Sequence, residues 1–147
     1  MVSTKPDDAK MAKGYVIVLL ILVIGIPLLI TFSTYVVPTI WVHNYITYKS
    51  HDGWSTVSEI LQKKSGVCRE YAVLLLWKLN MRQTNLMIVK RKGDDSTHAV
   101  VLVGDSLVLD PTRMTVHRFG YFYNQFWEVV KIVPYNKINS YVGRSVL

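Results

Sequence analysis

Hydrophobic and polar residues are distributed unevenly along the chain, and the first third differs sharply from the rest. From Gly14 to Tyr48 the sequence contains no Asp, Glu, Lys or Arg, and Tyr15–Ile30 is almost entirely aliphatic. As a helix, Gly14–Val37 would extend roughly 36 Å at about 1.5 Å per residue, enough to cross a hydrocarbon core of about 30 Å. Pro27 lies inside this segment, where a membrane helix tolerates it as a kink. The pattern predicts a transmembrane helix over residues 14–37.

The charges that flank this segment predict its orientation. Lys5, Lys10 and Lys13 precede it, whereas only Lys49 follows it closely. By the positive-inside rule, residues 1–13 form a cytoplasmic tail and the rest of the chain is extracytoplasmic. A cleaved signal peptide and a buried helix of a soluble protein are alternative interpretations. A signal peptide has an apolar region of about 7–15 residues and a small-x-small cleavage site, whereas this run is longer and residues 31–37 offer no such site. We therefore expect an uncleaved, single-pass signal anchor.

The remaining sequence has the pattern of one small domain. We expect residues 38–53 to be a linker and residues 54–147 to form the domain. Ser55 or Thr56 can cap a helix that runs to about Lys64, with a break at Ser65-Gly66. A second helix begins near Cys68, because apolar residues recur there at i, i+3, i+4 and i+7. Four strands are expected, over residues 86–90, 97–103, 106–110 and 127–133, and the aromatic residues 121–126 are ambiguous. This order predicts the α+β class, with helices packed on an antiparallel sheet.

Composition and charge exclude several classes of protein. Half of the 147 residues are hydrophobic and 18% are charged, which excludes a disordered, charge-dominated chain. The formal net charge of +7 is scattered without a run of like charges, so we expect no nucleic-acid partner. Cys68 is the single cysteine, which excludes an intrachain disulfide framework and a multi-cysteine zinc site.

Three residues in separate predicted elements could form a catalytic group. Cys68 lies at the first turn of a helix, where backbone N–H groups and the positive helix end stabilise a thiolate. His98 lies near the start of an apolar strand, and Asp110 ends the next strand. Taken singly, these residues are also consistent with a buried cysteine, a core histidine and a turn aspartate. Together they supply the nucleophile, base and orienting carboxylate of a Cys-His-Asp triad.

The segments around these three residues resemble a known family. Ser-Gly-Val-Cys68-Arg-Glu-Tyr-Ala, Thr-His98-Ala-Val and Leu-Val-Leu-Asp110-Pro-Thr occur in the order seen in the transglutaminase-like superfamily of papain-related folds. The closest resemblance is to the bacterial transglutaminase-like cysteine proteinases, over roughly residues 54–133. It implies that Cys68, His98 and Asp110 are the catalytic triad, and that a helix carrying Cys packs against an antiparallel sheet carrying His and Asp.

The resemblance also suggests oxyanion-hole residues and shows one departure from the family. Gln62 has the offset from Cys68 of the papain-type glutamine, and Trp54 occupies an upstream aromatic position of transglutaminase-like chains. Because a helix end lies between Gln62 and Cys68, Gln62 is better interpreted as a solvent-facing residue, which leaves the backbone N–H of Cys68 as the safer donor. Calcium-dependent members have acidic residues beside the Cys, but Val67 and Arg69 offer no side-chain oxygen ligand. We expect no calcium, no other metal and no cofactor.

The remaining polar residues give weaker signals. His43 and His51 are expected to be solvated in the linker. His117 could join Cys68 and His98 on a metal, but no short ligand spacing supports such a site. Arg69 and Glu70 could gate the cleft or form an exposed pair.

The predicted function is that of a membrane-anchored cysteine hydrolase, a protease or amidase that cleaves peptide or isopeptide bonds through a thioester intermediate. Its partners would be the membrane and a protein or peptide substrate at the membrane or cell envelope. One alternative is a cell-wall peptidase of the NlpC/P60 or CHAP type. The other is a catalytically silent, membrane-anchored interaction module.

The hairpin between the His98 and Asp110 strands provides a test of the triad, because side chains alternate faces with a period of two. A two-residue loop over 104–105 would turn Asp110 away from His98. A three-residue loop over 103–105 or 104–106 would place both on one face. Two-residue Gly-X loops are common. We nevertheless predict an odd-length loop or a bulge, since the triad requires it.

Overall fold

The computed structural model describes residues 6–81 and 83–147, and these form two compact units with a boundary between Thr34 and Tyr35. Lys5 lies outside the described residues, as does the side chain of Lys10.

The N-terminal unit is helical and apolar. It contains α1 (Pro6–Leu20), a π-helical turn η1 (Ile21–Gly25), α2 (Ile26–Thr31) and most of a second π-helical turn, η2 (Phe32–Val36). Each π-helical turn ends two residues before a proline, at Pro27 and Pro38. A proline ring clashes with the carbonyl of the residue four positions earlier, and a widened turn relieves that clash.

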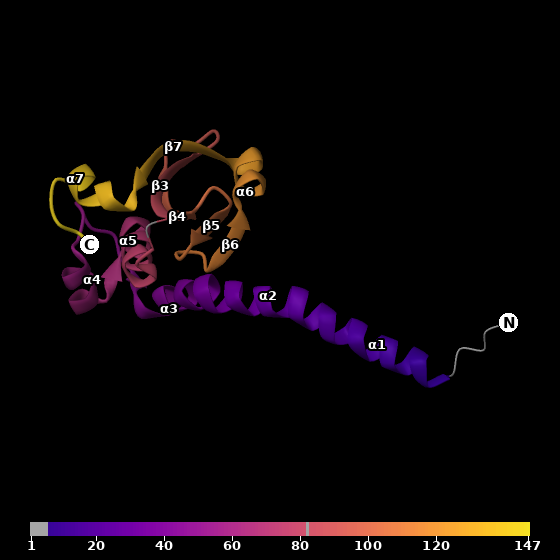
Figure 1. The fold of residues 1–147 in the computed structure, drawn as a ribbon. Helices are drawn as coiled ribbons and strands as arrows, with labels where there is room; N and C mark the ends of the chain where they lie inside the picture. The colour runs from indigo at the N-terminus through magenta and orange to yellow at the C-terminus, as the bar shows by residue number, and fades with distance from the viewer. Residues whose placement is uncertain (1–5, 82) are drawn as a thin grey trace. The chain divides into compact units, whose positions relative to one another are not determined.

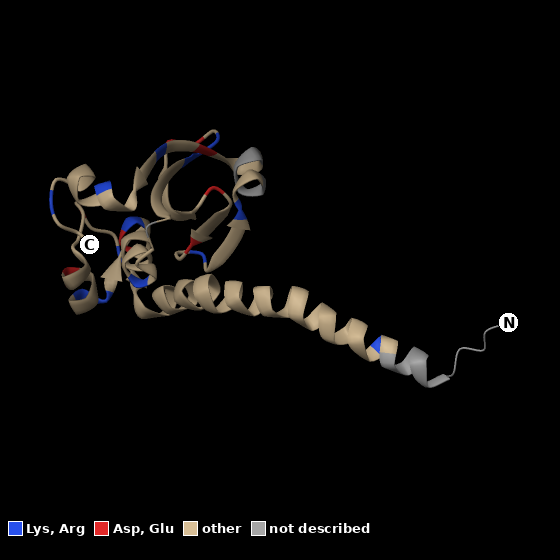
Figure 2. Cartoon of the chain, viewed as in Figure 1, with Lys and Arg blue, Asp and Glu red and all other residues tan. Residues whose placement is uncertain are grey.

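Continuous helix over residues 12–45 is long and apolar enough to cross a membrane, and a signal sequence satisfies the same criteria. Figure 2 shows α2 and α3 (Val37–Tyr45) without any Lys, Arg, Asp or Glu. The helix is therefore compatible with the expected membrane anchor.

Residues 38–53 are not the linker expected from the sequence. α3 packs against α5 (Cys68–Leu79), and Thr39, Val42 and Ile46 are buried there. These three residues are spaced as one face of a helix, and the polar and aromatic residues between them obscure this face in the sequence. A short strand, β1 (Thr47–Tyr48), then pairs in parallel with β2 (Ser65–Gly66). The C-terminal unit accordingly begins at Tyr35.

Both predicted helices of the domain are present. α4 (Val57–Lys63) begins with a capping box, in which the Thr56 side chain accepts the Glu59 N–H and the Glu59 carboxylate accepts the Thr56 N–H. Lys64 ends α4 in the left-handed conformation. α5 begins at Cys68, and its residues 71–76 are all buried, which makes it the central helix of the core.

A five-stranded antiparallel sheet packs against α5 and has the order β6-β5-β4-β3-β7 (Figure 1). Its strands are β3 (Thr84–Arg91), β4 (Thr97–Val103), β5 (Leu107–Asp110), β6 (Thr115–Arg118) and β7 (Trp127–Pro134). The sequence did not predict β6. The ambiguous aromatic segment belongs to α6 (Phe119–Phe126), and η3 (Tyr135–Lys137) and α7 (Ile138–Val142) follow β7. The α+β prediction is confirmed.

The register of the β4–β5 hairpin is one of the two that allow His98 and Asp110 to share a face. Val103 pairs with Leu107 and Val101 with Leu109, so residues 104–106 form a three-residue loop. Gly104 has a φ of +54°, a conformation that glycine adopts without strain. The predicted odd-length loop is confirmed.

Candidate active site

Cys68 is the first residue of α5 and lies half-buried in a cleft of about 460 Å³. The chain enters α5 through a close contact, because a Cβ atom on Gly66 would lie 2.5 Å from the Cβ of Glu70. Glycine at this position therefore allows the first turn of α5 to pack under β2. As the N1 residue of the helix, Cys68 has a backbone N–H without an intrahelical acceptor.

His98 and Asp110 are brought together by the hairpin. His98 Nε2 lies 2.8 Å from Asp110 Oδ2, and the Asp110 side chain is completely buried. The other carboxylate oxygen, Oδ1, accepts the backbone N–H groups of Thr112 at 3.0 Å and Arg113 at 3.2 Å. These turn amides fix the carboxylate, which in turn holds the imidazole through Nε2. The ring nitrogen Nδ1 is then the one that remains for the thiol.

The His98 imidazole is held from a second side by an aromatic ring. The ring of Trp127 lies 5.6 Å from that of His98, and the Arg113 guanidinium lies 5.1 Å from the Trp127 ring. The Arg113 Nε atom is also 3.8 Å from Asp110 Oδ2. Neither Trp127 nor Arg113 was identified from the sequence. Arg113 lies three residues after Asp110, a spacing that could have indicated it.

The thiol and imidazole favour each other's charged form. Burial opposes ionisation of Cys68, but hydrogen bonds from His98 and from the backbone N–H groups of Ala99 and Arg69 outweigh it and lower the pKa of the thiol. Burial likewise disfavours the imidazolium of His98, yet its hydrogen bonds to Asp110 and Cys68 raise its pKa to about 9. The arrangement therefore favours a thiolate–imidazolium pair.

A family model described as a transglutaminase-like domain matches residues 15–141. The chain belongs to this transglutaminase-like family.

Solved structures have the same fold at low sequence identity. Calcium-bound LapG of Legionella pneumophila gives a TM-score of 0.55 at 15% identity, covering 65% of this chain and 63% of that protein. Another structure of L. pneumophila LapG gives a TM-score of 0.52 at 13% identity, covering 76% and 77%. The chain thus spans 63% of the length of the first of these structures. No curated protein matches the sequence.

The two oxyanion candidates of this transglutaminase-like domain lie in different surroundings. Trp54 lines the cleft, with its ring 6.1 Å from that of Tyr141. Gln62 is exposed on α4 and lies outside the cleft lining, because the five residues between it and Cys68 complete α4 and form β2. The structure therefore brings Trp54, but not Gln62, to the cleft.

The structure also places the remaining polar residues that the sequence singled out. His43 is a residue of α3, and its Nδ1 atom lies 3.1 Å from the Pro111 carbonyl oxygen. Glu70 is completely buried, so it and Arg69 are not an exposed pair. His117 lies on β6 opposite Val108. Among the residues that the structure describes, no three His, Cys, Asp or Glu side chains are grouped so that they could hold a metal ion.

Proposed function

We propose that this protein is a membrane-anchored cysteine hydrolase that cleaves peptide or isopeptide bonds with Cys68, His98 and Asp110. The 2.8 Å contact between His98 and the buried Asp110 carries the proposal, because a fixed carboxylate orients an imidazole whose other nitrogen serves the thiol. Membership of the transglutaminase-like family and the position of Cys68 at the start of α5 support it.

The reaction begins with the Cys68 thiolate and the His98 imidazolium. Sγ attacks the substrate carbonyl carbon, and the carbonyl oxygen becomes an oxyanion that the Cys68 backbone N–H can stabilise. As the tetrahedral intermediate collapses, His98 gives its proton to the leaving amine, and a thioester to Cys68 remains. Asp110 holds the imidazole in one orientation throughout.

The second half of the reaction releases the acyl group. Neutral His98 takes a proton from water, and the resulting hydroxide attacks the thioester carbonyl. The carboxylic acid departs and the thiolate–imidazolium pair is restored. A primary amine in place of water would give a new amide, so the same site serves hydrolysis or amine transfer.

We propose that this reaction does not require calcium. One of the LapG structures is described as calcium-bound. Here the residues beside Cys68 are Val67 and Arg69, and the Arg69 Nε donates to Glu70 at 3.1 Å. Glu70 is the acidic residue nearest to Cys68 in sequence, and a carboxylate already paired with a cationic side chain does not suit a divalent cation that needs several oxygen ligands.

The proposed substrate lies at the extracytoplasmic surface of the membrane that holds the anchor, or in the cell envelope. Support comes from the apolar helix over residues 12–45 and from the lysine excess before it. In this arrangement the anchor keeps the cleft near the membrane and restricts the substrates that it meets.

The test is peptide-library and peptidoglycan digestion by the purified full chain in detergent micelles, with Cys68→Ala as the matched control. We expect new carboxyl and amino termini with the parent chain and none with the variant. Iodoacetamide labelling at neutral pH accompanies it, because a thiolate reacts quickly and a buried thiol slowly. Slow labelling together with no cleavage would contradict the proposal and favour a non-catalytic interaction module.

A further inference from the structure

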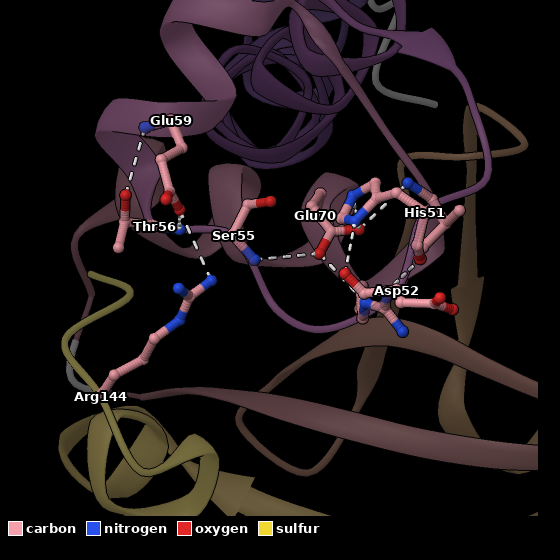
Figure 3. Close-up of polar contacts among 9 residues, drawn as sticks. His51, Asp52, Ser55, Thr56, Glu59, Glu70 and Arg144 are labelled. Carbon is pink, nitrogen blue, oxygen red and sulfur yellow. Dashed lines mark hydrogen bonds and ion pairs between the residues drawn. The ribbon is translucent and has the colours of Figure 1, made fainter.

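The Glu70 carboxylate joins the start of α5 to a loop far away in the sequence. Glu70 is completely buried. Its Oε1 accepts the backbone N–H of Ser55 at 3.3 Å, and its Oε2 accepts that of Val67 at 3.0 Å (Figure 3). A buried carboxylate is tolerated only when it is well supplied with donors, so these amides are held to it firmly.

Arg69 strengthens the same connection. Its Nε atom donates to Glu70 Oε1 at 3.1 Å, and its Nη2 atom donates to the carbonyl oxygen of His51 at 2.7 Å. Its guanidinium also lies 5.9 Å from the centre of the Trp54 ring. The Arg69 side chain thus contacts the Glu70 carboxylate, the loop backbone and the Trp54 ring. A planar guanidinium with several donors can make all three contacts, whereas the ammonium group of a lysine cannot.

The His51 ring supplies a further attachment. Its Nε2 atom lies 3.4 Å from Glu70 Oε2, and Figure 3 shows Ser55 and His51 on either side of the Glu70 carboxylate. The loop of residues 51–55 is therefore attached through the His51 carbonyl, the His51 ring and the Ser55 amide. We call Arg69, Glu70 and these loop attachments the clamp.

The clamped loop forms one wall of the cleft that holds Cys68. His51, Asp52 and Trp54 line the cleft from the loop, and residues 97–99 line it from β4. Because Glu70 also fixes Val67, the residue before Cys68, the loop and the nucleophile are attached to the same carboxylate.

We propose that Arg69 and Glu70 are positioning residues that hold this wall at a fixed separation from Cys68. A peptide bound between the wall and the start of β4 then presents its carbonyl carbon to Sγ. This role rests on the proposed function. The thiol itself does not depend on either side chain, because its partners are the His98 side chain and the backbone N–H groups of Ala99 and Arg69.

The test compares Arg69→Met, Arg69→Lys and the shape-conserving Glu70→Gln in the full chain in detergent micelles. Arg144→Met is the matched control, because Arg144 pairs with Glu59 at 3.5 Å through an exposed contact and lies outside the cleft lining. Three quantities are measured: amide hydrogen exchange over residues 51–55, kcat and KM for a cleaved peptide, and the rate of Cys68 alkylation by iodoacetamide.

We expect Arg69→Met and Glu70→Gln to speed exchange over residues 51–55. Arg69→Met removes the guanidinium that holds the Glu70 carboxylate and the loop, and Gln offers one acceptor oxygen to the two amides of Ser55 and Val67. We expect kcat/KM to fall by about a hundredfold, the effect of a misplaced reacting group. Arg69→Lys should resemble Arg69→Met, and Arg144→Met should resemble the parent. Alkylation of Cys68 should remain at the parent rate.

Three results would overturn the inference: unchanged exchange in both Arg69→Met and Glu70→Gln, full peptide cleavage despite faster exchange, or a loss of alkylation equal to the loss of cleavage. If the parent chain cleaves nothing, the proposed function fails, and exchange over residues 51–55 still decides whether the clamp holds the loop.

Discussion

The two oxygens of the Asp110 carboxylate have different partners. Oδ1 accepts the N–H groups of the turn that follows β5, and Oδ2 contacts His98. The turn N–H groups fix the carboxylate independently of the imidazole. The orientation of His98 therefore follows from the turn after β5. At the scale of the residue, the turn therefore positions Asp110, Asp110 positions His98, and His98 hydrogen-bonds to the Cys68 thiol.

Replacing Cys68 or His98 by Ala should each reduce peptide cleavage by about a thousandfold or more, and the double variant should lose little further activity. Nucleophile and base act as one unit, so their effects are not additive. Asp110→Asn should give a smaller but still large loss, because the amide keeps its contact with the turn but donates to His98 Nε2 and so favours the wrong tautomer. Single-turnover kinetics on one peptide measure these losses, and additive effects in the double variant would contradict a Cys-His unit.

The pH dependence of Cys68 alkylation follows from the two pKa shifts. The thiol pKa is lowered, so the reactive thiolate forms on the acid side of the ordinary value of 9.0. The pKa of His98 is raised to about 9, so the imidazolium persists through neutral pH and is lost as the pH rises through that value. Alkylation should therefore begin at lower pH than in the denatured chain.

The control for this profile is His98→Ala, which removes the imidazolium and should move the alkylation profile to higher pH. Peptide cleavage should decline above about pH 9 in the parent, because protonated His98 is the donor to the leaving amine. Identical alkylation profiles for the parent and the variant would contradict the pairing.

At the scale of the element, the entry into α5 is the most constrained segment. β2 and the first turn of α5 approach so closely that a Cβ on Gly66 would overlap Glu70. The same first turn carries Cys68 and the carboxylate that holds the cleft wall. Packing and the site are therefore coupled in this one turn.

Gly66→Ala should lower the free energy of unfolding by about 1–3 kcal/mol, because the added methyl group forces a backbone or side-chain shift. Gly120→Ala is the matched control, since a Cβ at Gly120 meets nothing within 4 Å. Urea unfolding of the full chain in micelles, followed by circular dichroism, measures the difference. Equal urea midpoints for the two variants would show that β2 and α5 can move apart without lowering the free energy of unfolding.

At the scale of the whole molecule, the apolar helix and the cleft belong to two different compact units. The N-terminal unit is an apolar helix, and the C-terminal unit from Tyr35 onward carries the entire cleft. α3 belongs to the second unit, so the helical residues that follow the predicted span are part of the folded domain.

A reporter fused after Leu147 should be found outside the cytoplasm. The lysine excess before the apolar helix favours a cytoplasmic N-terminus. A pair of reporters, one active only inside and one only outside the cytoplasm, measures the orientation. Cytoplasmic activity of the fusion would contradict both the orientation and the proposed envelope substrate.

Treatment with EGTA should leave peptide cleavage unchanged. Val67 and Arg69 supply no carboxylate beside Cys68. Activity is measured before and after chelation and after addition of calcium. A loss that calcium restores would contradict the proposal of a metal-independent site.

The sequence by itself determined the features that depend on local chemistry. Uninterrupted apolarity predicted the long N-terminal helix, the capping residue types at Ser55 and Thr56 predicted the start of α4, and apolar periodicity predicted α5 from Cys68. The order of the Cys68, His98 and Asp110 segments was sufficient to suggest the transglutaminase-like family. Each of these signals follows from the order of residue types along the chain and needs no knowledge of contacts between distant residues.

Only the tertiary structure decided which distant residues share the site. α3 is part of the domain because its buried face finds a partner in α5, and that partner lies about 30 residues later. The path of the chain between α4 and α5 placed Gln62 outside the cleft lining and buried Glu70 behind the loop of residues 51–55. The hairpin register came from the three-residue loop, against the local preference for two residues. In each case the deciding interaction joins residues separated in sequence, so its free energy is absent from any local pattern.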